Sequence, residues 1–153
     1  MELKKIKFHN KTGTLFKIIK EDGIKLNLSG SITVFGVENY YTGKILKWVL
    51  NEFDIIKLRD IENNLLEASS KYGANKLDSK LIVKNGYKPM LITKIKHNCS
   101  ANDIIKHENG DLLTFNDIKK NKQYNVLLVL RHLSIKDETI YYNFEISRIE
   151  EKI

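Results

Sequence analysis

Cysteine and proline are nearly absent from this sequence. The chain of 153 residues has one cysteine, Cys99, and one proline, Pro89. A single cysteine cannot form an internal disulfide, so we expect a reducing compartment as the natural setting. No Gly/Ser-rich linker, repeat or low-complexity stretch divides the chain, which favours a single domain over residues 1–153.

Long apolar runs are also missing. Even the apolar stretch at 126–130 is far shorter than the roughly 20 residues that span a bilayer. The chain begins with charged residues, MELKKIKFHN, which lack the apolar core of a secretion signal. We therefore expect an intracellular protein that does not enter a membrane, and the sequence does not distinguish nucleus from cytoplasm.

The common catalytic motifs are not found either. The chain has no GxxxxGK[ST] phosphate loop, no HExxH and no GxSxG nucleophile elbow. Asp54, Asp60 and Glu62 lie on a predicted helix beside Lys57 and Arg59, a pattern typical of a salt-bridged outer face. We therefore predict that the protein is not an enzyme and needs no cofactor.

Metal binding has little support. His97, Cys99 and His107 carry donor atoms that zinc accepts, but their spacing matches no standard structural site and a fourth ligand is not evident. We expect these three residues to lie in a loop that carries a free thiol. The sequence predicts no metal site.

Positive charge is what the sequence has in excess. Lysine and arginine number 26 against 19 aspartates and glutamates, which gives a formal net charge of +7. Such an excess raises association with polyanions. A/T-rich codon usage and the need for a soluble surface would also produce many lysines, so the charge alone does not identify a ligand.

Strand-like segments dominate the first third of the chain. Residues 14–20 are rich in β-branched side chains, and after Glu21-Asp22-Gly23 the apolar residues alternate with polar ones over 24–28. We expect these two segments to form a hairpin. Further strands are predicted at 31–35 and 44–50.

One helix is predicted in the middle of the chain. Leu58, Ile61, Leu65 and Ala68 recur at three- and four-residue spacing within residues 53–71, which is the pattern of an amphipathic helix. Either Asn51 or Asp54 could cap its start, and Gly73 follows its end.

The second half returns to strands. We predict strands at 77–83 and 89–96 around an Asn85-Gly86 turn, and a long loop or short strands over 97–122. A closing hairpin is expected from 123–133 and 139–149, with its turn at Lys136–Glu138. The pattern predicts a mainly β fold, either a barrel or a sandwich, with one amphipathic helix between strands.

Several motifs resemble one protein family. The stretches are TVFGVENYYTGKILKWVLN, DIIKLRDIENNLLEASSKYG, LDSKLIVKNGYKPMLITKIK and the final hairpin, in that order over roughly residues 14–150. They are similar to the viral single-stranded DNA-binding proteins related to the phage T7 replication protein, which also occur in large DNA viruses. The shared features are a Phe-Gly element, a Tyr-rich loop with Gly-Lys, and a helix with an Ile-Glu pair.

The resemblance implies an OB-fold-like small barrel that coats single-stranded DNA during viral DNA replication and recombination. OB barrels bind strands on one face. One departure concerns partners. The phage-type proteins end in a strongly acidic tail that contacts replication proteins, whereas this chain ends in RIEEKI.

Sequence-independent binding of a single strand needs cations for the phosphates and flat rings for the bases. Basic and aromatic residues are interleaved in three segments, around 40–48, 80–88 and 131–148. Lys94 and Lys96 alternate with Ile95 on a polar strand face, which could equally be a solvated face. The candidate nucleic-acid-binding residues are Tyr40, Tyr41, Lys44, Lys47, Trp48, Lys80, Lys84, Tyr87, Lys94, Lys96, Arg131 and Tyr141.

Strand alternation makes some of these rings better core than surface candidates. If Lys47 points outward, Trp48 points inward, and Tyr142 and Phe144 share an apolar face with Ile140. Any single tyrosine could instead be a half-buried ring whose hydroxyl meets water.

Other functions stay open at this point. An OB-like barrel can act as a protein-interaction or accessory module, and RNA is barely separable from DNA by sequence alone. An exposed barrel edge or the closing hairpin could also pair two subunits as a homodimer.

Overall fold

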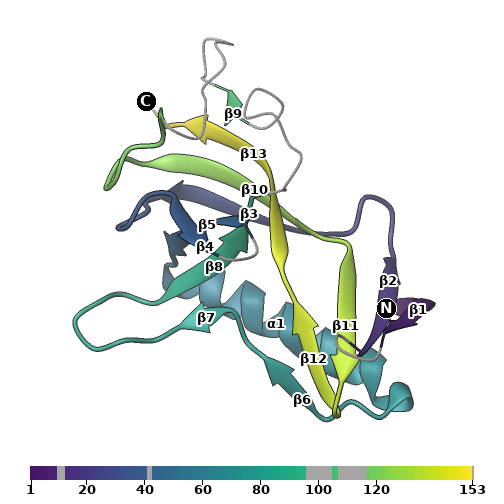
Figure 1. Cartoon of the computed structure of the whole chain (residues 1–153). Helices are drawn as coiled ribbons and strands as arrows, with labels where there is room; N and C mark the ends of the chain where they lie inside the picture. Colours follow the sequence, from purple (N-terminus) through teal and green to yellow (C-terminus); the bar gives the residue numbers. More distant parts are fainter. Residues whose placement is uncertain (10–12, 41–42, 96–104, 107–116, 153) are drawn as a thin grey trace.

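A computed structural model describes residues 1–9, 13–40, 43–95, 105–106 and 117–152. The fold is mainly β with one long helix between strands, as predicted (Figure 1). The strands are β1 (Glu2–His9), β2 (Gly13–Ile19), β3 (Ile24–Ser31), β4 (Glu38–Tyr40), β5 (Gly43–Val49), β6 (Lys76–Asp78), β7 (Leu81–Ile82), β8 (Met90–Lys94), β9 (Ile105–Lys106), β10 (Tyr124–Leu130), β11 (His132–Lys136), β12 (Thr139–Tyr142) and β13 (Phe144–Glu151). The helix α1 (Glu52–Ser69) is followed by a short 3-10 turn, η1 (Ser70–Tyr72).

Five strands form a small barrel. Their hydrogen-bonded order is β3-β10-β13-β8-β5, and β13 runs parallel to β8. The segment just after β3 closes the barrel against β5. Thr33 forms a β-bridge with Trp48, and the Val49 N–H donates to the Ile32 carbonyl at 2.9 Å. This is an OB-like small β fold, with α1 inserted between the second and third barrel strands along the chain.

A second sheet continues from the barrel. Its order is β1-β2-β11-β12-β6. Only Arg131 separates β10 from β11, and only Asn143 separates β12 from β13. The closing hairpin therefore bends from one sheet into the other, as the green and yellow strands of Figure 1 show.

The helix α1 lies beneath the strands in the view of Figure 1. Asn51 caps it, because its side chain accepts from the Asp54 N–H at 2.8 Å and the Asp54 carboxylate accepts from the Asn51 N–H. Leu58 and Leu65 are fully buried against the strands. Gly73 ends the helical segment with a positive φ of 83°, a backbone conformation that glycine adopts without a steric penalty.

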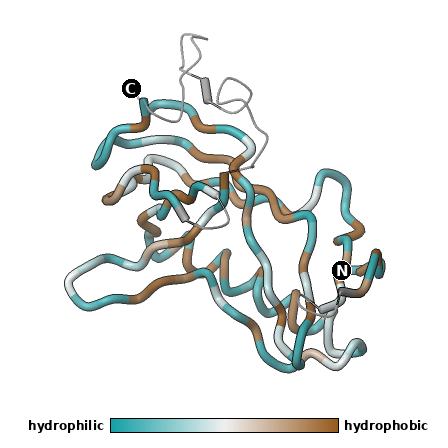
Figure 2. The backbone as a smooth tube through the Cα atoms, in the orientation of Figure 1, coloured by the Kyte–Doolittle hydropathy of each residue, from teal (hydrophilic) through white to brown (hydrophobic). Residues whose placement is uncertain are grey.

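One hydrophobic cluster includes side chains of both sheets and of α1. Apolar and polar residues alternate along most strands, which Figure 2 shows as alternating brown and teal. Trp48 packs edge-on against Tyr124 at a centroid distance of 6.1 Å, and Tyr142 packs against Phe144 at 5.7 Å. Large aromatic rings therefore fill the centre of the molecule.

The predicted N-terminal hairpin is wrong. Residues 14–20 and 24–28 do form neighbouring strands in sequence, but β2 pairs with β1 and β11, whereas β3 pairs with β10. The turn between them moves the chain from one sheet to the other. Gly23 allows this, since a Cβ there would lie 2.6 Å from the Leu130 carbonyl oxygen.

Other predicted elements differ in extent. The sequence analysis missed β1. No separate strand forms over 31–35, because Ser31 ends β3 and Thr33 forms an isolated bridge. The predicted strand at 77–83 is instead divided into β6 and β7, which belong to different sheets. The turn at Lys136–Glu138 is confirmed, although each arm of the closing hairpin is divided into two strands.

Candidate functional site

The outer side of β5 and β8 carries two lysines that alternate with isoleucines, with a glutamate of β4 beside them. Opposite residues of paired strands face the same side of a sheet. Lys47 pairs with Ile92, Ile45 pairs with Lys94, and Glu38 of β4 pairs with Ile45. These five residues share one face, which we call the β5–β8 face.

The opposite side of the same two strands faces the barrel interior. Leu46, Trp48 and Leu91 lie there and are completely buried. The expected alternation of Lys47 outward and Trp48 inward is confirmed. Trp48 must therefore be removed from the candidate binding residues, because no part of its ring is accessible to a base in the folded barrel.

Two aromatic rings meet at one end of the β5–β8 face. The centroids of Phe35 and Tyr87 are 5.5 Å apart at an angle of 50°. The Lys47 ammonium lies 5.2 Å from the Phe35 centroid and 3.1 Å from the Glu38 carboxylate. Tyr87 is 47% exposed and Phe35 is half-buried, so both rings have area available to a ligand.

Tight turns hold these rings in place. Gly36 has a positive φ of 66°, and its N–H donates to the hydroxyl of Thr33 at 3.2 Å, which fixes the chain beside Phe35. The Tyr87 N–H donates to the Lys84 carbonyl at 3.2 Å across the Asn85-Gly86 turn. The predicted turn is therefore present, and it presents Tyr87 at the surface.

A groove of about 320 Å³ opens where the closing hairpin bends between the two sheets. Its lining includes Lys94, Arg131, His132, Tyr141 and Glu145. Arg131 forms an ion pair with Glu145 at 3.7 Å, and Tyr141 is 42% exposed. The groove is therefore a second place, besides the Phe35–Tyr87 pair, where basic and accessible aromatic side chains line one surface.

Lys94 connects the two places. It lies two residues beyond Ile92 on β8, on the same face as Lys47, and it pairs in register with Glu145 of β13. It also lines the groove. Lys94 is therefore common to the β5–β8 face and the groove. We call the Phe35–Tyr87 pair, the β5–β8 face and the groove together the aromatic–basic track.

The remaining candidates fall outside this track or outside the described residues. Lys44 is exposed but precedes Ile45 on the strand, so alternation directs it away from Lys47. Lys80 is paired with Asp78 at 2.9 Å, and Lys84 is exposed on its turn. Tyr40 belongs to β4, but its side chain is not described.

Several residues that the sequence analysis discussed lie outside the part of the chain that the structure describes. Tyr41 and Lys96 lie outside the described residues, as do His97, Cys99 and His107. Within the part of the chain that is described, no group of three or more metal-ligating side chains occurs. In the same part, no helix combines the length and the hydropathy that a bilayer crossing requires.

Sequence reasoning missed Phe35. It assigned residues 31–35 to a strand and so treated Phe35 as part of the β pattern. The signal that could have found it is its position directly before Gly36, where a turn ends the strand pattern and exposes the ring. His132 was also missed, and it lines the groove beside Arg131.

The interior holds a polar pair. The Tyr142 hydroxyl donates to Glu62 Oε2 at 2.6 Å and accepts from the Lys80 N–H at 3.4 Å. Burial and the hydrogen bond to Glu62 raise the pKa of Tyr142 far above its ordinary range. The pair ties α1 to β12. Glu62 is therefore buried and does not lie on an outer salt-bridged face as predicted.

Asp54 also departs from that expectation. It is buried at the start of α1, where burial raises its pKa while the hydrogen bond from the Asn51 backbone lowers it. Its role is in the cap, so it is not available as part of a carboxylate cluster.

The fold belongs to the OB-like class of small barrels. The chain is similar in structure to a single-stranded DNA-binding protein from bacteriophage Enc34, with a TM-score of 0.61 over 99% of this chain and 89% of that chain. The two sequences are 12% identical, so the likeness concerns the fold. No protein-family model matches this sequence, and no curated protein matches it.

Proposed function

We propose that this protein binds single-stranded DNA without sequence preference. The observation that carries the proposal is the aromatic–basic track. It runs from Phe35 and Tyr87 over Lys47 and Lys94 to the groove at Arg131. In OB barrels the face of the second and third strands, with its flanking loops, is the surface that binds oligonucleotides. Here that face is β5–β8.

The chemistry of the track suits a single strand. A base stacked on an aromatic ring contributes about 1–3 kcal/mol, and any base can stack. Tyr87 and Tyr141 are accessible rings near the two ends of the track, with Lys94 between them for phosphate contact. A duplex would hide its bases from both rings, so a preference for single strands follows.

Two carboxylates temper the positive charge of the track. Glu38 pairs with Lys47, and Glu145 pairs with Arg131. A bound phosphate would have to compete with these carboxylates. We therefore assign base stacking the larger share of affinity at this surface, and the net charge of +7 a role in attracting the strand.

We further propose that the protein acts on displaced strands in viral DNA replication and recombination. The family resemblance of the Phe35–Lys44 region supports this, as does the similarity in fold to a phage protein. Replication proteins are the corresponding class of partner.

Fluorescence anisotropy with labelled oligo-dT, a duplex and an RNA of matched length tests the binding function. We expect oligo-dT to bind more tightly than the duplex and the affinity to fall as salt increases. Tighter binding of the RNA would favour an RNA-binding role. Absence of binding at low salt would contradict the proposal and favour an interaction module.

A matched pair of variants locates the surface. Tyr87→Ala should weaken oligo-dT binding by about tenfold, since one stacked ring contributes about 1–3 kcal/mol. Phe53→Ala removes a ring that is 74% exposed on α1, away from the track, and should leave binding unchanged. Equal effects of the two variants would argue against the track as the binding surface.

A further inference from the structure

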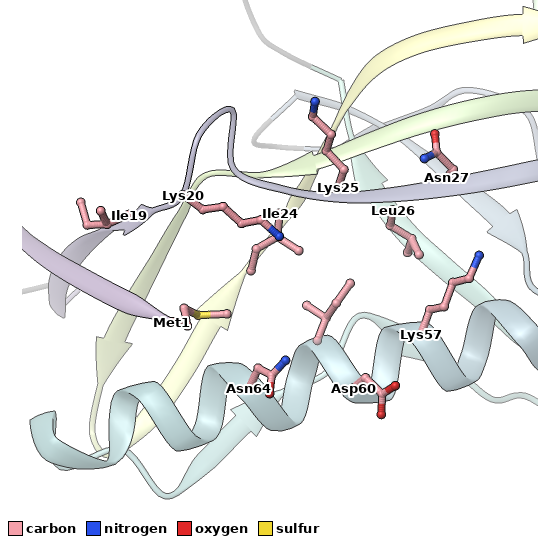
Figure 3. A pocket seen from close by; sticks show the side chains of 11 residues that line it. Met1, Ile19, Lys20, Ile24, Lys25, Leu26, Asn27, Lys57, Asp60 and Asn64 are labelled. Atoms are coloured by element: carbon pink, nitrogen blue, oxygen red, sulfur yellow. The ribbon is translucent and has the colours of Figure 1, made fainter.

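A larger hollow lies on a different part of the surface. It has a volume of about 610 Å³ and opens between α1, β3 and the end of β2. Figure 3 shows Met1, Ile24 and Leu26 around the space above the helix. Ile19 and Ile61 complete an aliphatic floor.

The rim of this hollow is basic. Lys20, Lys25 and Lys57 are among its lining residues, with one carboxylate, Asp60. Figure 3 shows that the Lys25 side chain leaves β3 on the side away from α1, so Lys20 and Lys57 are the cations beside the hollow. Lys20 and Lys25 form no ion pair with any residue in the described part of the chain. An excess of basic over acidic side chains around apolar residues favours a ligand that carries both negative charge and apolar side chains.

Exposed apolar residues extend the hollow along α1. Phe53 is 74% exposed and Ile56 is 60% exposed, one turn before Lys57 and Asp60. The Lys57 ammonium lies 5.9 Å from the Phe53 centroid. Exposed apolar area that adjoins a cavity is a common mark of a protein-binding site.

This surface is separate from the aromatic–basic track. None of the residues that line the hollow lines the groove at the closing hairpin, and the two sites use different strands. Aliphatic side chains line the hollow together with lysines, Asn27, Asp60 and Asn64, and no aromatic ring is among its lining residues. Its chemistry fits Leu, Ile or Phe side chains of a peptide better than it fits bases.

We infer that this hollow, with Phe53 and Ile56, docks an acidic amphipathic segment of a partner protein. The lysines would meet the partner's carboxylates, and its apolar side chains would enter the hollow. Peptide segments of this kind place apolar anchors in grooves while charged residues set the orientation. The inference does not depend on what the aromatic–basic track binds.

The test uses a fluorescein-labelled synthetic peptide in which Asp and Glu alternate with Leu and Phe. A control peptide keeps the acids and replaces Leu and Phe by Ser. We expect the first peptide to bind at low salt and the control to bind at least about tenfold more weakly, because the floor contacts are lost. Equal binding of both peptides would overturn the inference.

Protein variants fix the location. Lys20→Glu with Lys57→Glu should weaken peptide binding by about tenfold or more through like-charge repulsion, and Phe53→Ala with Ile56→Ala should also weaken it. Lys76→Glu, an exposed lysine of β6, is the matched control and should have no effect. Thermal unfolding of each variant checks that the fold is retained.

Simultaneous binding provides the last criterion. Saturating oligo-dT should leave peptide binding in place, since the two surfaces share no lining residue. Displacement of the peptide by oligo-dT would place the peptide on the other surface and refute the docking site. Unchanged peptide affinity in the Lys20→Glu, Lys57→Glu variant would refute it as well.

Discussion

Two regions of this protein use the same kinds of side chain for opposite purposes. On the surface, Tyr87 and Tyr141 are 47% and 42% exposed, whereas Trp48 and Tyr142 in the interior are 0% and 1% exposed. Tyr141 and Tyr142 are neighbours in sequence. Because successive strand residues face opposite sides, one ring is offered to a ligand while the next fills the core.

The comparison teaches that a ring's type does not decide its role. In the interior, rings are held by contacts with other rings and by the Tyr142–Glu62 hydrogen bond. On the aromatic–basic track, the rings lie beside cations, and part of each ring's surface stays exposed to solvent. Substitutions inside should change the free energy of unfolding, and substitutions outside should change affinity.

The largest effect is expected from Trp48→Ala. Removing a fully buried large ring costs about 3–5 kcal/mol of unfolding free energy, measured by urea unfolding followed by circular dichroism. Lys44→Ala, an exposed residue of the same strand, should change it by no more than about 0.5 kcal/mol. Similar unfolding free energies of the two variants would contradict the assignment of Trp48 to the interior and Lys44 to the surface.

Tyr142→Phe should come next. It removes the hydroxyl that donates to Glu62 and leaves a buried carboxylate without that partner, at a cost of about 1–3 kcal/mol in unfolding free energy. Tyr141→Phe, its exposed neighbour, is the control and should change stability little. An unfolding free energy of Tyr142→Phe equal to that of the wild type would mean that the Tyr142–Glu62 hydrogen bond contributes nothing to stability.

The same tyrosine gives a pH dependence. Its pKa is raised on folding from the ordinary tyrosine value of 10.0, so the unfolded chain loses this proton at a lower pH than the folded protein does. The resulting stability is fully present below that ordinary value and falls as pH rises above it. Urea unfolding over this alkaline range should show a weaker decline for Tyr142→Phe than for the wild type.

Tyr141→Ala tests whether the exposed ring in the groove contributes to DNA affinity. If the groove extends the track, loss of this ring should weaken a long oligo-dT by about 1–3 kcal/mol and leave a short one, held at Tyr87, unaffected. Anisotropy titrations with a series of lengths measure this. An equal effect at every length would mean that the groove and the Phe35–Tyr87 pair do not contact successive parts of the same DNA strand.

The smallest effect is expected from Lys94→Ala. If Lys94 contacts one phosphate, the slope of log affinity against log salt should decrease by about 0.7. Lys76→Ala is the control, since Lys76 lies on β6 in the second sheet. A slope that is unchanged would mean that Lys94 connects the two ring sites without contacting the backbone of the strand.

Local signals in the sequence predicted the elements that depend on local contacts. The helix, a cap by Asn51 or Asp54, and the glycine that follows the helix were expected from spacing and residue type. The helix and the glycine are present, and Asn51 is the cap with Asp54 as its partner. The turn at Lys136–Glu138 was found for the same reason. Each of these features is decided by hydrogen bonds between residues a few positions apart.

Partners across long sequence distances were not predictable. Alternation over 24–28 indicated a half-buried strand, but β3 pairs with β10, about a hundred residues away, and not with β2. Glu62 looked like an outer-face residue, yet Tyr142 from the closing hairpin buries and satisfies it. Phe35 gained its neighbours Tyr87 and Lys47 only when three separate segments met.

The sequence by itself determined that the fold is mainly β with one helix, that Lys47 faces outward and Trp48 inward, and that positive charge is in excess, because these follow from periodicity and composition. Only the tertiary structure decided which strands pair, which rings stay exposed and which cations stand beside them. Such choices depend on contacts between residues distant in the chain, and their energies arise only when the core excludes water around them.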